Sequence, residues 1–363
     1  MPGPGNIHEA TRAYEKWMRS SLLVVESELT AKHTAMKADP FSFFRGTYYR
    51  WAQLWPVVCK DLTRAPTVLA VGDLHVDSFG TWRDREGRFC WGVDDFDESY
   101  PLPYANDLVR LAASVKLMVD AERIDMKFRK ACQVILEGYE RTLREGGRPI
   151  VLAENETDLE KLGVQALKAP PDFWQTMLRH PPVRNGQFPH DARAAIEKTL
   201  PGTRLRYKVV HRQSGLGSLG QQRFVVIADW QGGCIAREAK ARRAPACEWL
   251  RGRAKSRTRY YEALIMSAVR SRDPYQHVMG KWIIRRLSPD SNPIEVSTLP
   301  GERDDEILLY AMGQEAANVH LGTSTRVKRI LRDLRNREKN WLRSAAKRMA
   351  RTMEREWEEY AKK

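Results

Sequence analysis

The feature that most constrains this chain is a cluster of carboxylates at the ends of two short apolar runs. Residues 67–71 are β-branched and apolar, which predicts a buried strand that leads to Asp73. Residues 88–93 follow a turn-like segment at 84–87, and we expect them to form the hairpin partner of that strand. The second run ends in further acids, at Asp94, Asp95, Asp97 and Glu98.

Carboxylates this close repel one another and raise one another's pKa, so a fold tolerates them best where a cation neutralises the charge. Mg²⁺ prefers carboxylate oxygens and commonly bridges them to substrate phosphates. The alternative is a solvated acidic hairpin, which is the usual setting of a run of charges. Because the acids follow runs too apolar for surface strands, we favour a metal site, with Asp77 as a further acid beside it.

A glycine-rich stretch at residues 205–241 carries the second chemical signal. It contains a GxGxxG pattern at residues 215–220, which is weak alone because a dinucleotide-binding fold needs a helix directly after the glycines. Here the apolar run 223–228 predicts a strand instead, and a third predicted strand leads to Lys240. Strand, glycine-rich turn, strand and a third strand with a lysine are typical of the phosphate-covering part of a kinase small lobe.

The glycines would let backbone N–H groups approach phosphates closely, and Lys240 would contact the α- and β-phosphates. If the strand register differs, Arg237 would contact the phosphates in place of Lys240. For the glycine-rich segment itself, the alternative is a hairpin turn with surplus glycine. A helix is predicted at 248–270. Glu262 is our choice to pair with Lys240 and Glu248 is the second choice, with a surface position as the alternative for either.

Four motifs together resemble the DUF2252 family, whose pattern is approximately GDxHxxNFG, NDFDE and DLxRLAxS. In this chain they stand at residues 72–75, 79–80, 95–98 and 106–114, as GDLH, FG, DFDE and NDLVRLAAS. The resemblance is tight at these motifs and extends more loosely from about residue 40 to about residue 325. That family in turn resembles the protein-kinase-like phosphotransferases, which include aminoglycoside and choline kinases.

The resemblance implies a role for each candidate site residue. Asp73 would be the catalytic base, and His75 would orient the catalytic loop. Asp95, Asp97, Asp77 and Ser78 would be the positions that bind Mg²⁺ or Mn²⁺, and Gly215, Gly217, Ser218, Gly220, Lys240 and Glu262 would bind ATP. This chain departs from the family at Ser78 and at Asp94, each of which stands where the family has Asn.

The order of these parts is inverted relative to ordinary kinases, in which the glycine-rich loop precedes the catalytic Asp. The resemblance therefore implies an α+β, two-lobed, kinase-like fold that is circularly permuted, with extra N- and C-terminal helices. The predicted divisions are a catalytic-loop half of the helical lobe at 1–145, a linker or insert at 146–204, an N-lobe-like sheet with helix C at 205–290, a hinge and return helix at 291–325, and a basic C-terminal helix at 326–363.

Helical periodicity predicts helices at 7–37, 41–62, 106–121, 126–144, 305–320 and 327–363. Asp107 lies in the first turn of one of them, where it either caps the helix or braces the catalytic loop. His320 at the end of another is interpreted as a structural residue or a partner of the helix dipole.

Composition narrows the class of protein. A hydrophobic content of 42% with 11 Trp excludes a disordered chain. The five cysteines are scattered without a CxxC pair, which favours a reducing cytoplasm and no structural zinc. No run approaches the ~20 apolar residues of a membrane span. The net charge of +15 suits anionic partners; we favour a nucleoside triphosphate, with nucleic acid as the less favoured partner.

These patterns predict an ATP- and Mg²⁺-dependent phosphotransferase that acts on an unidentified hydroxyl acceptor. Within the same fold, a nucleotide-binding pseudokinase and an enzyme that transfers AMP are alternatives. The pair Asp73 and His75 also resembles the first ligands of metallophosphoesterases, although the downstream motif of that class is missing. The charge keeps a basic nucleic-acid-binding protein as a further alternative.

Overall fold

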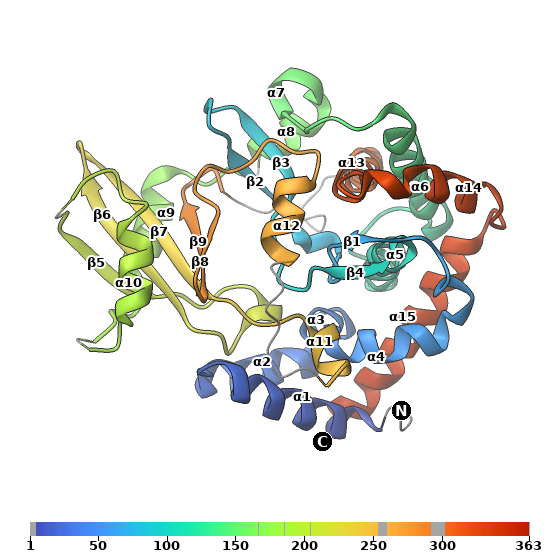
Figure 1. Ribbon diagram of the computed structural model, residues 1–363, viewed down its shortest axis with the longest axis horizontal. Helices are drawn as coiled ribbons and strands as arrows, with labels where there is room; N and C mark the ends of the chain where they lie inside the picture. The colour runs from blue at the N-terminus through green and yellow to red at the C-terminus, as the bar shows by residue number, and fades with distance from the viewer. Residues whose placement is uncertain are drawn as a thin grey trace.

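The structure is a computed structural model that describes residues 5–165, 167–184, 186–203, 205–252, 260–291 and 302–362. Helices and small antiparallel sheets occur together, which confirms the α+β class. A five-stranded sheet lies at the left of Figure 1 and a larger helical body at the right, with α12 (Tyr260–Ser267) between them. No helix among the described residues is long and apolar enough to cross a bilayer.

The five-stranded sheet is antiparallel, with the strand order β5-β6-β7-β9-β8. Its strands are β5 (Tyr207–His211), β6 (Arg223–Trp230), β7 (Gly233–Ala241), β8 (His277–Met279) and β9 (Trp282–Leu287). The strands predicted on either side of the glycine-rich turn are therefore present. In the central strand β7, Lys240 lies between Arg223 of β6 and Ile283 of β9.

Each face of this sheet has its own helix. The helix α10 (His190–Glu197) packs on one face, against Phe224, Val226, Ala239, Trp282 and Ile284. The helix α9 (Pro170–Arg179) packs on the other face, against Val225, Ile227, Ala236 and Leu287. Because side chains alternate along a strand, Glu238 and Lys240 share the face of Ala236, at the end that α9 leaves uncovered. Segment 146–204, predicted as a linker or insert, thus contains α9 and α10, the helices that pack on the two faces of the sheet.

The helical body has one large apolar core. Its main helices are α1 (Ile7–Ser21), α2 (Glu26–Ala38), α3 (Pro40–Gly46), α4 (Tyr48–Val58), α5 (Tyr104–Asp120), α6 (Phe128–Glu145), α13 (Glu302–Leu321), α14 (Val327–Arg335) and α15 (Trp341–Ala361). Shorter helices are α7 (Leu152–Asn155), α8 (Thr157–Gln165) and α11 (Ala246–Leu250). The helix predicted at 248–270 corresponds to α11 and α12, and residues 253–259 lie outside the described residues.

The predicted pairing of residues 67–71 with 88–93 is wrong. Strand β1 (Thr67–Ala70) pairs with β4 (Tyr100–Pro103), and β3 (Phe89–Val93) pairs with β2 (Phe79–Arg83). The reason is local, because Asp84 Oδ1 accepts the backbone N–H groups of Glu86 (3.0 Å) and Arg88 (2.9 Å) and so closes the β2–β3 turn. Residues 94–98, called the acidic turn from here on, therefore connect β3 of one small sheet to β4 of the other.

Three predicted long helices are each divided in two. The first is interrupted after α1, because Val25 N–H donates to Gly220 O (2.9 Å) and Val24 forms a bridge with Gln221. The second is divided at Thr47, between α3 and α4. The third is divided at residues 336–340, where Asn336 N–H donates to Asp333 O (3.1 Å) in a turn between α14 and α15.

Asp107 braces the loop that follows β1. Its side chain is fully buried and accepts the backbone N–H groups of Val71 (2.7 Å) and Gly72 (3.0 Å). His320, at the end of α13, lies 3.1 Å from the same carboxylate through Nε2 and 2.8 Å from the Tyr139 hydroxyl through Nδ1. Bracing is thus the role of Asp107, and the structural interpretation of His320 is confirmed.

Asp107→Asn should destabilise the fold by about 2–4 kcal/mol, because an amide accepts fewer of these hydrogen bonds and leaves buried donors unpaired. Urea unfolding measures the loss. Asp61→Asn is the matched control, since Asp61 is exposed and forms an ion pair with exposed Arg348 at 2.9 Å. A loss for Asp107→Asn no larger than that of the control would contradict the bracing role.

Candidate functional site

A cavity of about 300 Å³ lies between the five-stranded sheet and the acidic turn. Of the predicted site residues, its lining includes Asp73, His75, Asp77, Ser78, Asp95, Asp97, Gly215, Gly217, Ser218 and Lys240. Gly220 and Glu262 are not part of this lining. Most of the predicted site, drawn from segments far apart in the sequence, therefore meets in one cleft.

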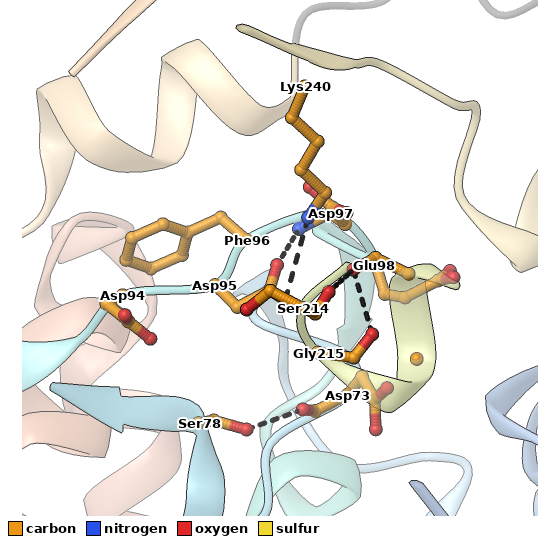
Figure 2. A network of polar contacts seen from close by, with 12 residues as sticks. Asp73, Ser78, Asp94, Asp95, Phe96, Asp97, Glu98, Ser214, Gly215 and Lys240 are labelled. Carbon is orange, nitrogen blue, oxygen red and sulfur yellow. Dashed lines mark hydrogen bonds and ion pairs between the residues drawn. The ribbon is translucent and has the colours of Figure 1, made fainter. Parts of the chain in front are cut away.

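Lys240 joins the sheet to the acidic turn. Its Nζ lies 3.8 Å from Asp95 Oδ2 and forms a closer ion pair with Asp97 (Figure 2). The lysine side chain is buried, whereas that of Asp95 is half exposed. Burial alone would raise the pKa of Asp95, but the positive charges of Lys240 and Arg285 lower it to about 2. Asp95 is therefore ionised at neutral pH and open to the cleft.

The glycine-rich loop lies against Asp73. A Cβ at Gly217 would be 3.9 Å from Asp73 Oδ2 and 3.4 Å from Arg45 O, so the loop backbone approaches the carboxylate closely. Ser218 Oγ donates to the carbonyl oxygens of Ser214 and Gly215 (3.0 Å each) and thereby fixes the turn. Figure 2 shows Ser214 and Gly215 between the acidic turn and Asp73.

Helix α2 anchors this loop, a contact that the sequence did not reveal. Buried Glu28 accepts the Gly220 N–H (3.1 Å) and lies 2.7 Å from His211 Nε2. Lys32 Nζ donates to Gly217 O (3.3 Å). Gly220, with φ of 91°, thus belongs to the anchor of the loop rather than to the cavity wall.

Asp73 is held by Arg110, a residue inside a recognised motif to which no role was given. Arg110 Nε donates to Asp73 Oδ1 (2.6 Å), and its guanidinium lies 4.0 Å from the centre of the Phe44 ring. Tyr48 and Trp51 complete an aromatic enclosure around this fully buried arginine. Burial raises the pKa of Asp73, and Arg110 opposes that rise.

The residues after Asp73 hold the loop in shape. His75 Nδ1 accepts the Asp77 N–H (3.2 Å), as expected for a residue that orients the loop, and burial keeps the His75 pKa well below its usual value. Ser78 Oγ donates to Asp73 O and accepts the His75 N–H, both at 3.0 Å. Asp77 forms an ion pair with Arg45 at 2.8 Å. A metal-binding role for Asp77 and Ser78 stays a prediction.

The donor set fits Mg²⁺ in one specific way. The described residues contain no group of three or more His, Cys, Asp or Glu side chains arranged to hold a metal ion. Mg²⁺ is, however, commonly held by one or two carboxylates together with substrate phosphates rather than by an all-protein cage. Asp95 and Asp97 supply two carboxylates from one turn, so they fit this shared mode of binding.

Several further ionic residues line or support the cleft. Glu238, fully buried on β7, binds Arg212 (2.9 Å) and Arg223 (2.9 Å) and approaches Arg285 at 3.4 Å. Glu98 accepts from Arg243 (2.5 Å), and burial raises the Glu98 pKa to about 7 against the opposing charge of that arginine. The strand register places Arg285 directly opposite Glu238, a pairing that sequence spacing alone does not reveal.

Lys240 is the lysine of the cleft, and the alternative Arg237 instead lies over the Tyr275 ring at 4.0 Å. The ion pairs of Lys240 described here are with Asp95 and Asp97. Its predicted pair with Glu262, on α12, or with buried Glu248 stays a prediction.

The pair of His211 and Glu28 should make stability depend on pH. The hydrogen bond to Glu28 raises the His211 pKa, so the stabilisation is complete below the unfolded pKa and is lost as pH rises through the folded pKa. Urea unfolding at pH 6 and pH 9 should show this loss, of no more than about 1 kcal/mol for a partly exposed pair. In His211→Gln the loss of stability between pH 6 and pH 9 should be smaller. An unchanged loss would contradict the attribution of this pH dependence to the pair of His211 and Glu28.

Comparison with known proteins gives one family. No curated protein and no solved structure matches the chain. The family model described as "Uncharacterized protein conserved in bacteria (DUF2252)" matches residues 24–180. The matched segment contains Asp73, Asp95, Asp97 and the motif at 106–114, and it ends before the glycine-rich loop and Lys240. The match, together with these motifs, supports assignment of residues 24–180 to the DUF2252 family.

Proposed function

We propose that this protein is an ATP- and Mg²⁺-dependent phosphotransferase with a circularly permuted, kinase-like arrangement that acts on a hydroxyl acceptor. One observation carries the proposal. Lys240, on the third strand of an antiparallel sheet, meets Asp95 and Asp97 in the cleft that also contains Asp73 and the loop 214–218. Phosphoryl transfer depends on positioning and charge neutralisation, for which a lysine, carboxylates and backbone N–H groups are the usual means.

The order of elements gives further support. A glycine-rich turn joins β5 and β6, the lysine follows on β7, and two helices precede β8 and β9, which is the order expected of a kinase small lobe. The end of α13 lies beside β1, since Leu69 N–H donates to Thr323 Oγ1 at 3.0 Å. A chain of unpermuted order would pass directly from that helix to that strand.

Each residue of the cleft has a distinct task under this proposal. Asp73 Oδ1 is bonded to Arg110, which leaves Oδ2 to accept the proton of the acceptor hydroxyl. The backbone of the loop 215–218 and Lys240 hold the phosphates. To do so, Lys240 replaces its ion pair with Asp97 by contacts to phosphate oxygens. Asp95 and Asp97 would hold Mg²⁺ or Mn²⁺, which neutralises phosphate charge when bound.

Lys240→Met and Asp95→Asn should each weaken Mg²⁺-dependent ATP binding at least tenfold, because each removes a charge that faces the nucleotide phosphates. Isothermal titration calorimetry measures the affinity. Lys208→Met and Asp229→Asn make the same changes at exposed positions of the same sheet and should bind ATP like the wild type. Equal affinity in the cleft variants and their controls would refute the assigned site.

Asp73→Asn should bind Mg²⁺–ATP with affinity near that of the wild type but react about 10²–10⁴-fold more slowly, because it removes the general base. Transfer to water or to added hydroxyl compounds can be followed with ATP labelled at the γ- or the α-phosphate. Label from the γ-phosphate supports phosphate transfer, and label from the α-phosphate supports the AMP-transfer alternative instead. An undiminished rate in Asp73→Asn would exclude Asp73 as the base.

A further inference from the structure

A second charged region of the cleft lies beyond Asp94 and takes no part in the mechanism above. Figure 2 shows the Asp94 side chain directed away from Lys240 and from the loop at Ser214. Arg285 faces it, with Nη1 3.2 Å from Asp94 O and 3.8 Å from Asp94 Oδ2. Arg270 and Arg286 line the same cavity as Arg285. These three arginines are here called the arginine subsite.

Arg270 is the most unusual member of the arginine subsite. Its guanidinium lies between two aromatic rings, 4.6 Å from the centre of Trp82 and 4.9 Å from that of Phe96. Its Nε and Nη1 atoms are buried without a hydrogen-bond partner among the described residues. A guanidinium has five N–H donors, and withdrawing them from water without acceptors costs free energy.

The neighbours of Arg270 share this feature. Arg285 Nε and Arg286 Nε are also buried without a partner among the described residues. Arg286 is otherwise fixed by a hydrogen bond from Nη2 to Arg83 O (2.9 Å) and by the Tyr275 ring, 5.0 Å away. Rings and backbone thus hold Arg270 and Arg286, and Arg285 also contacts the carboxylates of Asp94 and Glu238. The buried nitrogen atoms named above have no hydrogen-bond partner among the described residues.

Carboxylates also lie near the arginine subsite. Asp94 and Asp273 line the cavity on this side, and buried Glu315 interacts electrostatically with Arg270. Glu238 is shared by Arg285, Arg212 and Arg223. The sign of the local charge therefore does not point to an anion, whereas the buried N–H groups without partners among the described residues do. Planar guanidinium groups bind phosphate oxygens through paired N–H donors, and they do so most strongly where water is excluded.

We infer that Arg270, Arg285 and Arg286 form an oxyanion subsite that takes a phosphate group without help from the acidic turn. The inference rests on the proposed function for the choice of phosphate as the anion. It divides the cleft in two: one phosphate region at Lys240 with the acids Asp95 and Asp97, and a second, metal-independent region at the arginines. The second phosphate belongs either to a phosphorylated acceptor or to the distal part of the nucleotide.

The test uses inorganic phosphate with the full-length protein in EDTA, at ionic strength held constant with chloride. Wild-type protein should show a saturable rise in melting temperature with phosphate, because ligands that bind only the folded state raise apparent stability. Arg270→Met keeps a long side chain between the rings but should weaken the apparent affinity about tenfold or more. Arg141→Met removes the same charge from an exposed position on α6 and should respond like the wild type.

Two results would overturn the subsite: no response of the wild type beyond that to chloride, or a folded Arg270→Met that binds phosphate like the wild type. If Arg270→Met does not unfold cooperatively, Arg286→Gln replaces it, with the same weakening expected and the same criterion. Lys240→Met should retain the phosphate response, which separates this subsite from the nucleotide region. Failure of the proposed function alone would appear as a normal phosphate response without Mg²⁺–ATP affinity.

A final arm identifies the source of the phosphate. Phosphate titrated in the presence of saturating Mg²⁺–ATP should still stabilise the protein if the subsite serves a separate phosphorylated acceptor. Loss of the response under that condition would assign the subsite to the phosphates of the nucleotide itself. Either result supports phosphate binding at Arg270, provided that the response depends on that residue.

Discussion

The contact of Lys240 with Asp95 and Asp97 is the interaction on which the arrangement of the cleft depends. It joins the central strand of the sheet to a turn of the helical body that lies far away in the sequence. The lysine is buried, so the opposite charges interact in a medium of lower polarity than water. Removing one partner would leave an uncompensated buried charge, which is why the two parts are held in one relative position.

Around this contact, most charges of the cleft are matched by a second layer of buried partners. Arg110 fixes Asp73 inside an aromatic enclosure, and Arg243 fixes Glu98 beside it. Asp107 holds the backbone that leads to Asp73. Such pairing fixes the positions of Asp73 and Glu98 within the cleft, which under the proposed function is the condition for electrostatic preorganisation. The arginine subsite differs in degree, because each of its three arginines has at least one buried nitrogen atom without a partner among the described residues.

The sequence predicted those features that depend on neighbouring residues. The apolar run 223–228 and the turn that follows it located β6 and β7 and therefore placed Lys240 at the end of a strand. The motif around Asp95 identified an acidic turn that the structure brings to the cleft. The predicted partner of β1 was wrong, because strand pairing joins residues that are distant in the sequence and the true partner, Tyr100–Pro103, contains two prolines, which are unusual in a strand. Whether the fold is kinase-like and permuted stays a prediction.

Other features escaped prediction because their cause lies far along the chain. Helical periodicity continues across residues 22–25, but the backbone of Val25 bonds to Gly220 and ends the helix there. Lys32 and Glu28 resemble ordinary surface residues of an amphipathic helix, and only the fold shows that they hold the glycine-rich loop. Arg270 lacks any local signal, since its importance depends on two rings and a cavity supplied by other segments.

The most direct test of the central claim is a crystal structure with Mg²⁺ and a non-hydrolysable ATP analogue. The account predicts phosphate oxygens within hydrogen-bond distance of Lys240 Nζ and of the backbone N–H groups of residues 215–218, with the metal ion on Asp95. An analogue bound outside the cleft, or no bound analogue at a concentration that saturates ordinary kinases, would contradict the account.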